Sequence, residues 1–182
     1  MLFPQAIGSF QRAMPSIYDR GGRDVSGGYN LLRQGNPIVV TVYVYPAPPL
    51  IAVGSPDYII NDARARLLKG EFVRREQEIE QSHPNAVLLR EARTVLAAGG
   101  MASPGWTADF SYTESFSAGP AAVRSKLVVA QCPDAHWKAE YRFTSRGGIS
   151  EDNEIASFMQ ALALQVPRQA IPAKMTGGNS HF

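Results

Sequence analysis

Strict alternation of apolar and polar residues is the feature that most limits what this chain can fold into. In the segment Trp106–Thr113, Trp, Ala, Phe and Tyr take every second position and polar residues take the others. The segment His136–Phe143 alternates in the same way. Successive side chains of a β-strand point to opposite faces, so this pattern predicts strands rather than helices. A chain with such strands is expected to form an antiparallel sheet with one buried face.

Other segments have the composition of strands. Ile38–Tyr45 contains only β-branched and aromatic residues, and its apolar groups at both parities predict a central strand covered on both faces. The turn residues Gln131-Cys132-Pro133-Asp134 predict a hairpin between the strands before and after them. The remaining predicted strands are Ala6–Arg12, Val25–Leu32, Ala86–Leu96 and Val123–Gln131.

A long charged segment, Pro56–Gln81, has apolar residues at helical spacing and predicts a helix. Pro56 fits the first turn, with Ser55 as the expected N-cap. Its charged face has two interpretations. It is either a solvated face with i,i+4 pairs such as Glu71–Arg75, or a functional basic patch formed by Arg64, Arg66 and Lys69.

A second, amphipathic helix is predicted over Glu151–Gln165. Ser150 is its expected N-cap, and the acidic residues of the first turn suit the positive end of the helix dipole. Pro167 ends the pattern, and residues 167–182 are expected to form a loose C-terminal tail. The apolar stripe of this helix consists of Ile155, Phe158, Met159, Leu162 and Val166.

The order of these elements predicts a single α+β domain over residues 1–166. It contains an antiparallel sheet of about six to seven strands, flanked by a long central helix and a C-terminal amphipathic helix. Two features carry a resemblance to a known fold group. They are the strand Val42-Tyr43-Val44-Tyr45-Pro46, which follows an N-terminal strand pair, and the strand Trp137–Arg142, which precedes a final helix. The arrangement resembles the Mog1/PsbP-like fold group. That resemblance implies a binding, assembly or accessory role and includes no functional motif.

Charge and composition exclude several classes of function. Lys and Arg number 18 and Asp and Glu 16, a net charge of +2 that is too balanced for a nucleic-acid partner. The least charged stretch, Pro37–Pro56, is interrupted by prolines and cannot form a membrane-spanning helix. The start of the chain lacks the pattern of a signal peptide. We therefore expect a cytoplasmic protein, or an exported one if a leader has been removed.

Residues able to do chemistry are scattered. The three histidines, His83, His136 and His181, lack the spacing of a metal site, and the glycine-rich segment 21–28 lacks the ending of a phosphate loop. Cys132 is the single cysteine and lies in a predicted turn, where an incidental thiol is expected. The sequence thus predicts neither a metal nor a cofactor.

One predicted surface is a candidate binding site. His136, Lys138, Glu140 and Arg142 form the polar row of the last strand, and Arg124 and Lys126 are expected beside them on the neighbouring strand. This face is either solvated and held by cross-strand pairs with Glu140, or a site for an anionic ligand or an acidic partner. The sequence favours a non-catalytic binding or accessory domain for a protein partner or a small ligand. The alternative is a small hydrolase or isomerase with scattered active-site residues.

The alternation also makes a prediction about the core. One face of the sheet is expected to collect the aromatic residues of the late strands, covered by one of the two helices. These residues are Trp106, Phe110, Tyr112, Trp137, Tyr141 and Phe143.

Overall fold

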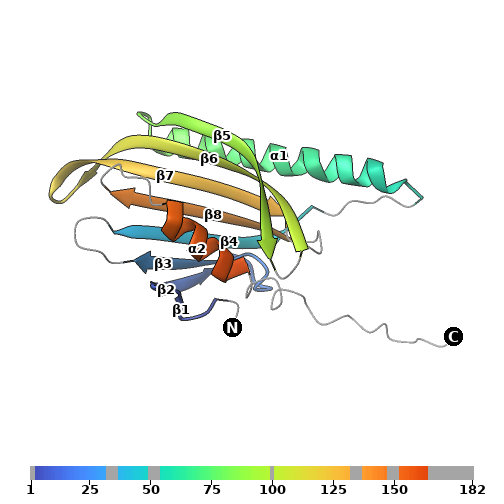
Figure 1. Ribbon diagram of the computed structural model, residues 1–182, viewed down its shortest axis with the longest axis horizontal. Helices are drawn as coiled ribbons and strands as arrows, with labels where there is room; N and C mark the ends of the chain where they lie inside the picture. Colours follow the sequence, from blue (N-terminus) through green and yellow to red (C-terminus); the bar gives the residue numbers. More distant parts are fainter. Residues whose placement is uncertain are drawn as a thin grey trace.

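An eight-stranded antiparallel sheet and two helices make up the part of the chain that the computed structural model describes, residues 3–31, 37–48, 54–98, 101–131, 137–146 and 152–163 (Figure 1). The predicted α+β class is confirmed. The helices are α1 (Asp57–Ser82) and α2 (Asp152–Ala163). The strands are β1 (Ala6–Ile7), β2 (Phe10–Ile17), β3 (Val25–Leu31), β4 (Ile38–Pro46), β5 (Val87–Ala98), β6 (Met101–Phe116), β7 (Gly119–Gln131) and β8 (Trp137–Arg146).

The sheet consists of two meanders that meet in its middle. Its strand order is β1-β2-β3-β4-β8-β7-β6-β5, and every neighbouring pair is antiparallel. Helix α1 carries the chain from β4 in the centre to β5 at the far edge, and the second meander then returns to β4. The long helix therefore has to cross the second meander, which places it over β6 and β7.

The sheet has one strand more than the sequence predicts at most. The predicted strand Ala6–Arg12 is divided by a turn at Gly8-Ser9 into β1 and β2. Gly8 has a φ of 56°, a left-handed conformation that glycine adopts without a steric penalty. A single apolar run in the sequence thus becomes a short hairpin at the edge of the sheet.

The β4 strand is central, as predicted, but its two faces are not covered equally. Ile38, Val40, Val42 and Val44 are all buried on one face. On the other face Tyr43 and Tyr45 are half-buried, and Val39 remains exposed. The expectation of two covered faces is therefore wrong at Val39, because α1 packs over the second meander and not over this end of β4.

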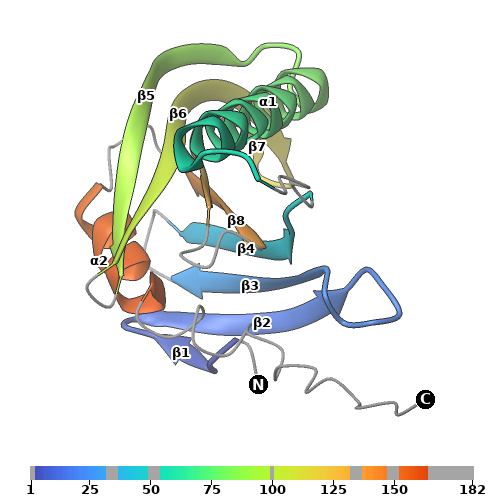
Figure 2. The same ribbon diagram turned by 90° about the vertical axis from the view of Figure 1, so that its right-hand side faces the viewer.

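The two helices cover opposite faces of the sheet (Figure 2). Under α2, the ring of Phe158 contacts Phe10, Tyr29 and Phe143, with centroids 4.8, 5.3 and 5.7 Å apart. Under α1, Phe72 belongs to a second cluster on the strands of the second meander. Each face therefore has its own hydrophobic core.

This division makes the prediction of one aromatic face wrong. Phe143 lies in the core under α2, whereas Phe110 and Tyr112 lie in the core under α1. The reason is the register: Phe143 pairs with Lys126 of β7, but Phe110 pairs with the next residue along, Ser125. Alternation places every second residue of a strand on the same face of the sheet. Only the register decides which residues of the neighbouring strand share that face. The side chains of Trp137 and Tyr141 are outside the described part of the structure.

Helix α1 has two unlike halves. Its buried residues, Leu68, Phe72, Glu76 and Ile79, begin near the middle of the helix, and residues 57–67 include none. Figure 1 shows the N-terminal half reaching past the ends of the strands. Its N-cap is Pro56, without a side-chain cap, so the prediction of Ser55 as N-cap is wrong. The expected N-cap Ser150 and the tail 167–182 are outside the described residues.

Candidate functional site

The sheet separates the basic residues that the sequence groups on one surface. Lys126 pairs with Phe143 and so faces α2, and Arg124 has the same parity. Arg142 pairs with Leu127 and faces α1. The prediction of a single basic face is therefore wrong for these three residues, again because the register was unknown. His136 and the side chain of Lys138 are outside the described part of the structure.

On the α1 side, Arg142 belongs to a buried ion network and not to a solvated row. The carboxylate of Glu140 is 1% exposed and contacts two guanidiniums, with Nε of Arg75 2.9 Å from its Oε2 and Arg142 on its Oε1. Arg142 also donates to Glu78 over 2.8 Å. Burial raises the pKa of Glu140, and the two guanidiniums oppose that shift. This network joins α1 to β8. The predicted Glu71–Arg75 pair is confirmed at 3.0 Å.

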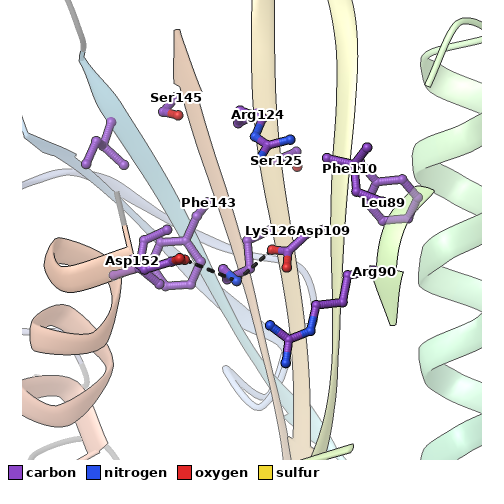
Figure 3. Close-up of a pocket in the computed structure, with 12 residues that line it drawn as sticks. Leu89, Arg90, Asp109, Phe110, Arg124, Ser125, Lys126, Phe143, Ser145 and Asp152 are labelled. Carbon is purple, nitrogen blue, oxygen red and sulfur yellow. Dashed lines mark ion pairs between the residues drawn. The ribbon is translucent and has the colours of Figure 1, made fainter. Parts of the chain in front are cut away.

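On the α2 side, Arg124 and Lys126 line a cavity of about 260 Å³ together with Arg90. Figure 3 shows Lys126 between two carboxylates, with its Nζ 2.6 Å from Asp109 and 3.5 Å from Asp152. These carboxylates neutralise most of the positive charge of the cavity. A further anion at Lys126 would meet their repulsion, so this cavity is a poor site for an anionic ligand.

A larger cavity lies between the N-terminal half of α1 and the β5–β6 hairpin. We call it the α1–β5–β6 groove, and its volume is about 720 Å³. Apolar surface makes up most of its walls, and basic residues of α1 and β5 lie along them. The groove is lined by Asn61, Asp62, Arg64, Ala65, Arg66, Leu68, Lys69, Arg93, Thr94, Val95, Ala102, Pro104, Gly105, Trp106 and Gln131.

Trp106 holds two cations at the inner end of this groove. The register places Arg93 directly opposite Trp106 on the adjacent strand, and its guanidinium carbon lies 5.3 Å from the ring centroid. The ammonium of Lys69, from α1, lies 4.0 Å from the same ring and also contacts Glu91. Cation–π contact of this kind fixes long basic side chains in place. Lys69 and Arg93 are therefore held in place by contacts within the protein.

The charges of the groove are only partly compensated. Arg66 pairs with Asp62, and Lys69 pairs with Glu91. Among the described residues, neither Arg64 nor Arg93 has a carboxylate partner. Arg64 is moreover half-buried, where an uncompensated charge is unfavourable. Within the described part of the structure, both guanidiniums are therefore available to pair with an anion in the cavity.

A buried carboxyl lies near the Lys69–Glu91 pair. Burial, together with the charge of Glu91, raises the pKa of Glu76 to about 7, while Lys69 opposes the shift. Oε1 of Glu76 has no hydrogen-bond partner within the described residues. Glu76 therefore changes its charge close to neutral pH, next to a cation of the groove.

Sequence reasoning identified part of this site. The basic patch Arg64, Arg66 and Lys69 was one of two interpretations of the charged helix, and the structure brings all three to the groove. Trp106 was assigned to the core, and Arg93 was not singled out. No local pattern marks this pair, since only the β5–β6 register shows that the two residues are opposite each other.

No family model, curated protein or solved structure matches this chain. The resemblance to the Mog1/PsbP-like fold group stays a prediction. No set of His, Cys, Asp or Glu side chains suited to a metal ion occurs among the described residues. Neither of the two described helices is both long and apolar enough to cross a membrane.

Proposed function

We propose that this protein is a non-catalytic binding domain that takes a small anionic ligand in the α1–β5–β6 groove. The observation that carries the proposal is a pair of arginines, Arg64 and Arg93, that line a cavity of about 720 Å³ and have no carboxylate partner among the described residues. Ligand cavities in proteins commonly measure about 300–1,000 Å³. A bound anion would accept charge-assisted hydrogen bonds from both guanidiniums.

The groove suits an anion better than the cavity beside α2. In the α2 cavity Lys126 already contacts two carboxylates. In the groove, the cations outnumber the acidic groups, and Trp106 and Glu91 hold two of the cations in fixed positions. Preorganised donors bind more tightly because little side-chain entropy is lost on binding.

An NMR titration with benzoate and citrate at constant ionic strength tests the proposal. We expect backbone amide shifts in residues 64–69 of α1 and at Arg93 and Trp106. The double variant Arg64→Gln/Arg93→Gln should bind at least tenfold more weakly, since a hydrogen bond to a charged group is worth about 1.5–3 kcal/mol. Arg74→Gln is the matched control, because Arg74 lies on α1 outside the groove and pairs with Glu71.

Two outcomes would contradict the proposal. Shifts centred on Lys126 and Asp109, unchanged in the double variant, would move the anion site to the cavity beside α2. Shifts of the groove amides by a poly-glutamate peptide, with none from benzoate or citrate, would replace the small ligand by an acidic protein partner.

A further inference from the structure

The apolar surfaces of the groove limit the chemistry of a ligand more narrowly than the charge of the groove does. We infer, on the basis of the proposed function, that the ligand is an anionic amphiphile, a molecule with an apolar body and a single carboxylate-type head. Each wall has an apolar surface, and cations lie beside both of these surfaces.

The helical wall is an apolar stripe that continues beyond the core. Phe72 and Leu68 are buried in the core under α1. Ala65 lies on the same face of the helix, three residues before Leu68, and Tyr58 lies there two turns before Ala65, with the polar Asn61 between them. Ala65 lines the groove, and Tyr58 is 72% exposed at the outer end of the helix. The stripe thus extends an apolar surface into a space that no described element fills.

The strand wall is apolar along β6 and at the end of β5 beside it. Trp106, Pro104 and Ala102 alternate along β6 and therefore point to the same side. Val95 of β5 lies directly opposite Pro104, which widens the surface by one strand. Val95 is 65% exposed, and Pro104 and Ala102 are exposed as well. The two apolar surfaces face each other across the groove.

The free cations lie beside these surfaces. Arg93 is the neighbour of Val95 on the same face of β5, and Arg64 flanks the apolar stripe of α1. A hydrophilic anion such as phosphate would satisfy the arginines but leave both walls in contact with water. A ligand with an apolar body would satisfy the arginines and also bury the walls, which is favourable in proportion to the area removed from water.

Calorimetric titration with decanoate, acetate and decyltrimethylammonium, all below micelle-forming concentrations, tests the inference. Decanoate and acetate share the head, and decanoate and decyltrimethylammonium share the body. We expect decanoate to bind at least tenfold more tightly than either of the others, because neither a head nor a body alone occupies the whole groove.

Variants assign the two parts of the ligand to the two parts of the groove. Val95→Ser, at an exposed position that does not support the fold, should weaken decanoate several-fold and leave acetate unchanged. Arg93→Gln should weaken decanoate and acetate alike. Arg74→Gln, outside the groove, should change neither.

The outcomes separate this inference from the proposed function. If acetate binds as tightly as decanoate and Arg93→Gln weakens both, the amphiphile is refuted while an anion site remains. If decyltrimethylammonium matches decanoate and the arginine variants have no effect, both proposals are wrong. If decanoate does not bind, the amphiphile is refuted as well, and the benzoate and citrate titration alone decides the proposed function.

Discussion

Replacing Arg75 with glutamine tests whether the buried ion network fixes α1 to the sheet. Its Nε lies 2.9 Å from Oε2 of Glu140, which is 1% exposed. Two unit charges about 4 Å apart attract by about 4 kcal/mol at an effective dielectric constant of about 20, and removing one partner of a buried pair costs about 3–5 kcal/mol. Arg142 stays beside Glu140 in the variant. We therefore expect a loss below that range, about 2–3 kcal/mol, or roughly 5–10 °C in Tm.

Thermal and urea unfolding followed by circular dichroism measure this loss. Arg74→Gln is the matched control, because Arg74 contacts the same Glu71 carboxylate over 2.7 Å but is 58% exposed. An exposed pair of this kind contributes at most about 1 kcal/mol. A double-mutant cycle with Glu140→Gln should give a coupling energy above about 1 kcal/mol. Equal losses in the Arg75 and Arg74 variants would refute the assignment.

Three further predictions concern the core, the helix and pH. Phe110→Ala should lower the unfolding free energy by about 3–5 kcal/mol in urea, since its ring is fully buried; a loss below about 1 kcal/mol would contradict the packing. Gly70→Ala should raise stability by about 0.5–1 kcal/mol, because Gly70 lies mid-helix with open space around it, and a lower Tm would contradict that. Folded Glu76 keeps its proton up to about pH 7, whereas the unfolded carboxyl loses it near its usual pKa of 4.5, so stability should fall as pH rises through this window. Glu76→Gln should therefore raise Tm more at pH 8 than at pH 5, and an equal change at both would contradict the raised pKa.

The elements of the fold could be predicted because their signals are local. The helical spacing predicted Pro56–Gln81, and α1 spans Asp57–Ser82. The pairing of strands could not be predicted in the same way. Whether Phe143 shares a face with Phe110 depends on a one-residue difference in register, which is decided by contacts between strands and not by the pattern within either.

The same limit explains the errors about the site. A charged residue at a polar position of an alternating strand is ordinarily solvated, so Glu140 was expected on a wet face. Its burial depends on Arg75, which comes from a helix much earlier in the chain. Likewise the basic patch of α1 was visible in the sequence, but its apolar counterpart at Trp106 belongs to a strand that only the fold brings opposite the helix.

The two halves of α1 differ in what they contribute. The second half is fixed to the sheet by Phe72 and Ile79 in the core and by the ion pair of Arg75 with Glu140. Residues 57–67 include no buried residue, yet Tyr58 lies on the same face as Ala65 and Leu68, and Arg64 is half-buried without a carboxylate partner in the described residues. Neither residue stabilises the described fold, because exposed apolar surface and uncompensated charge are both unfavourable. The proposed ligand would cover this apolar surface and neutralise the charge, which would account for both residues, and the attachment of the second half of α1 to the sheet would hold the proposed binding surface beside β5 and β6.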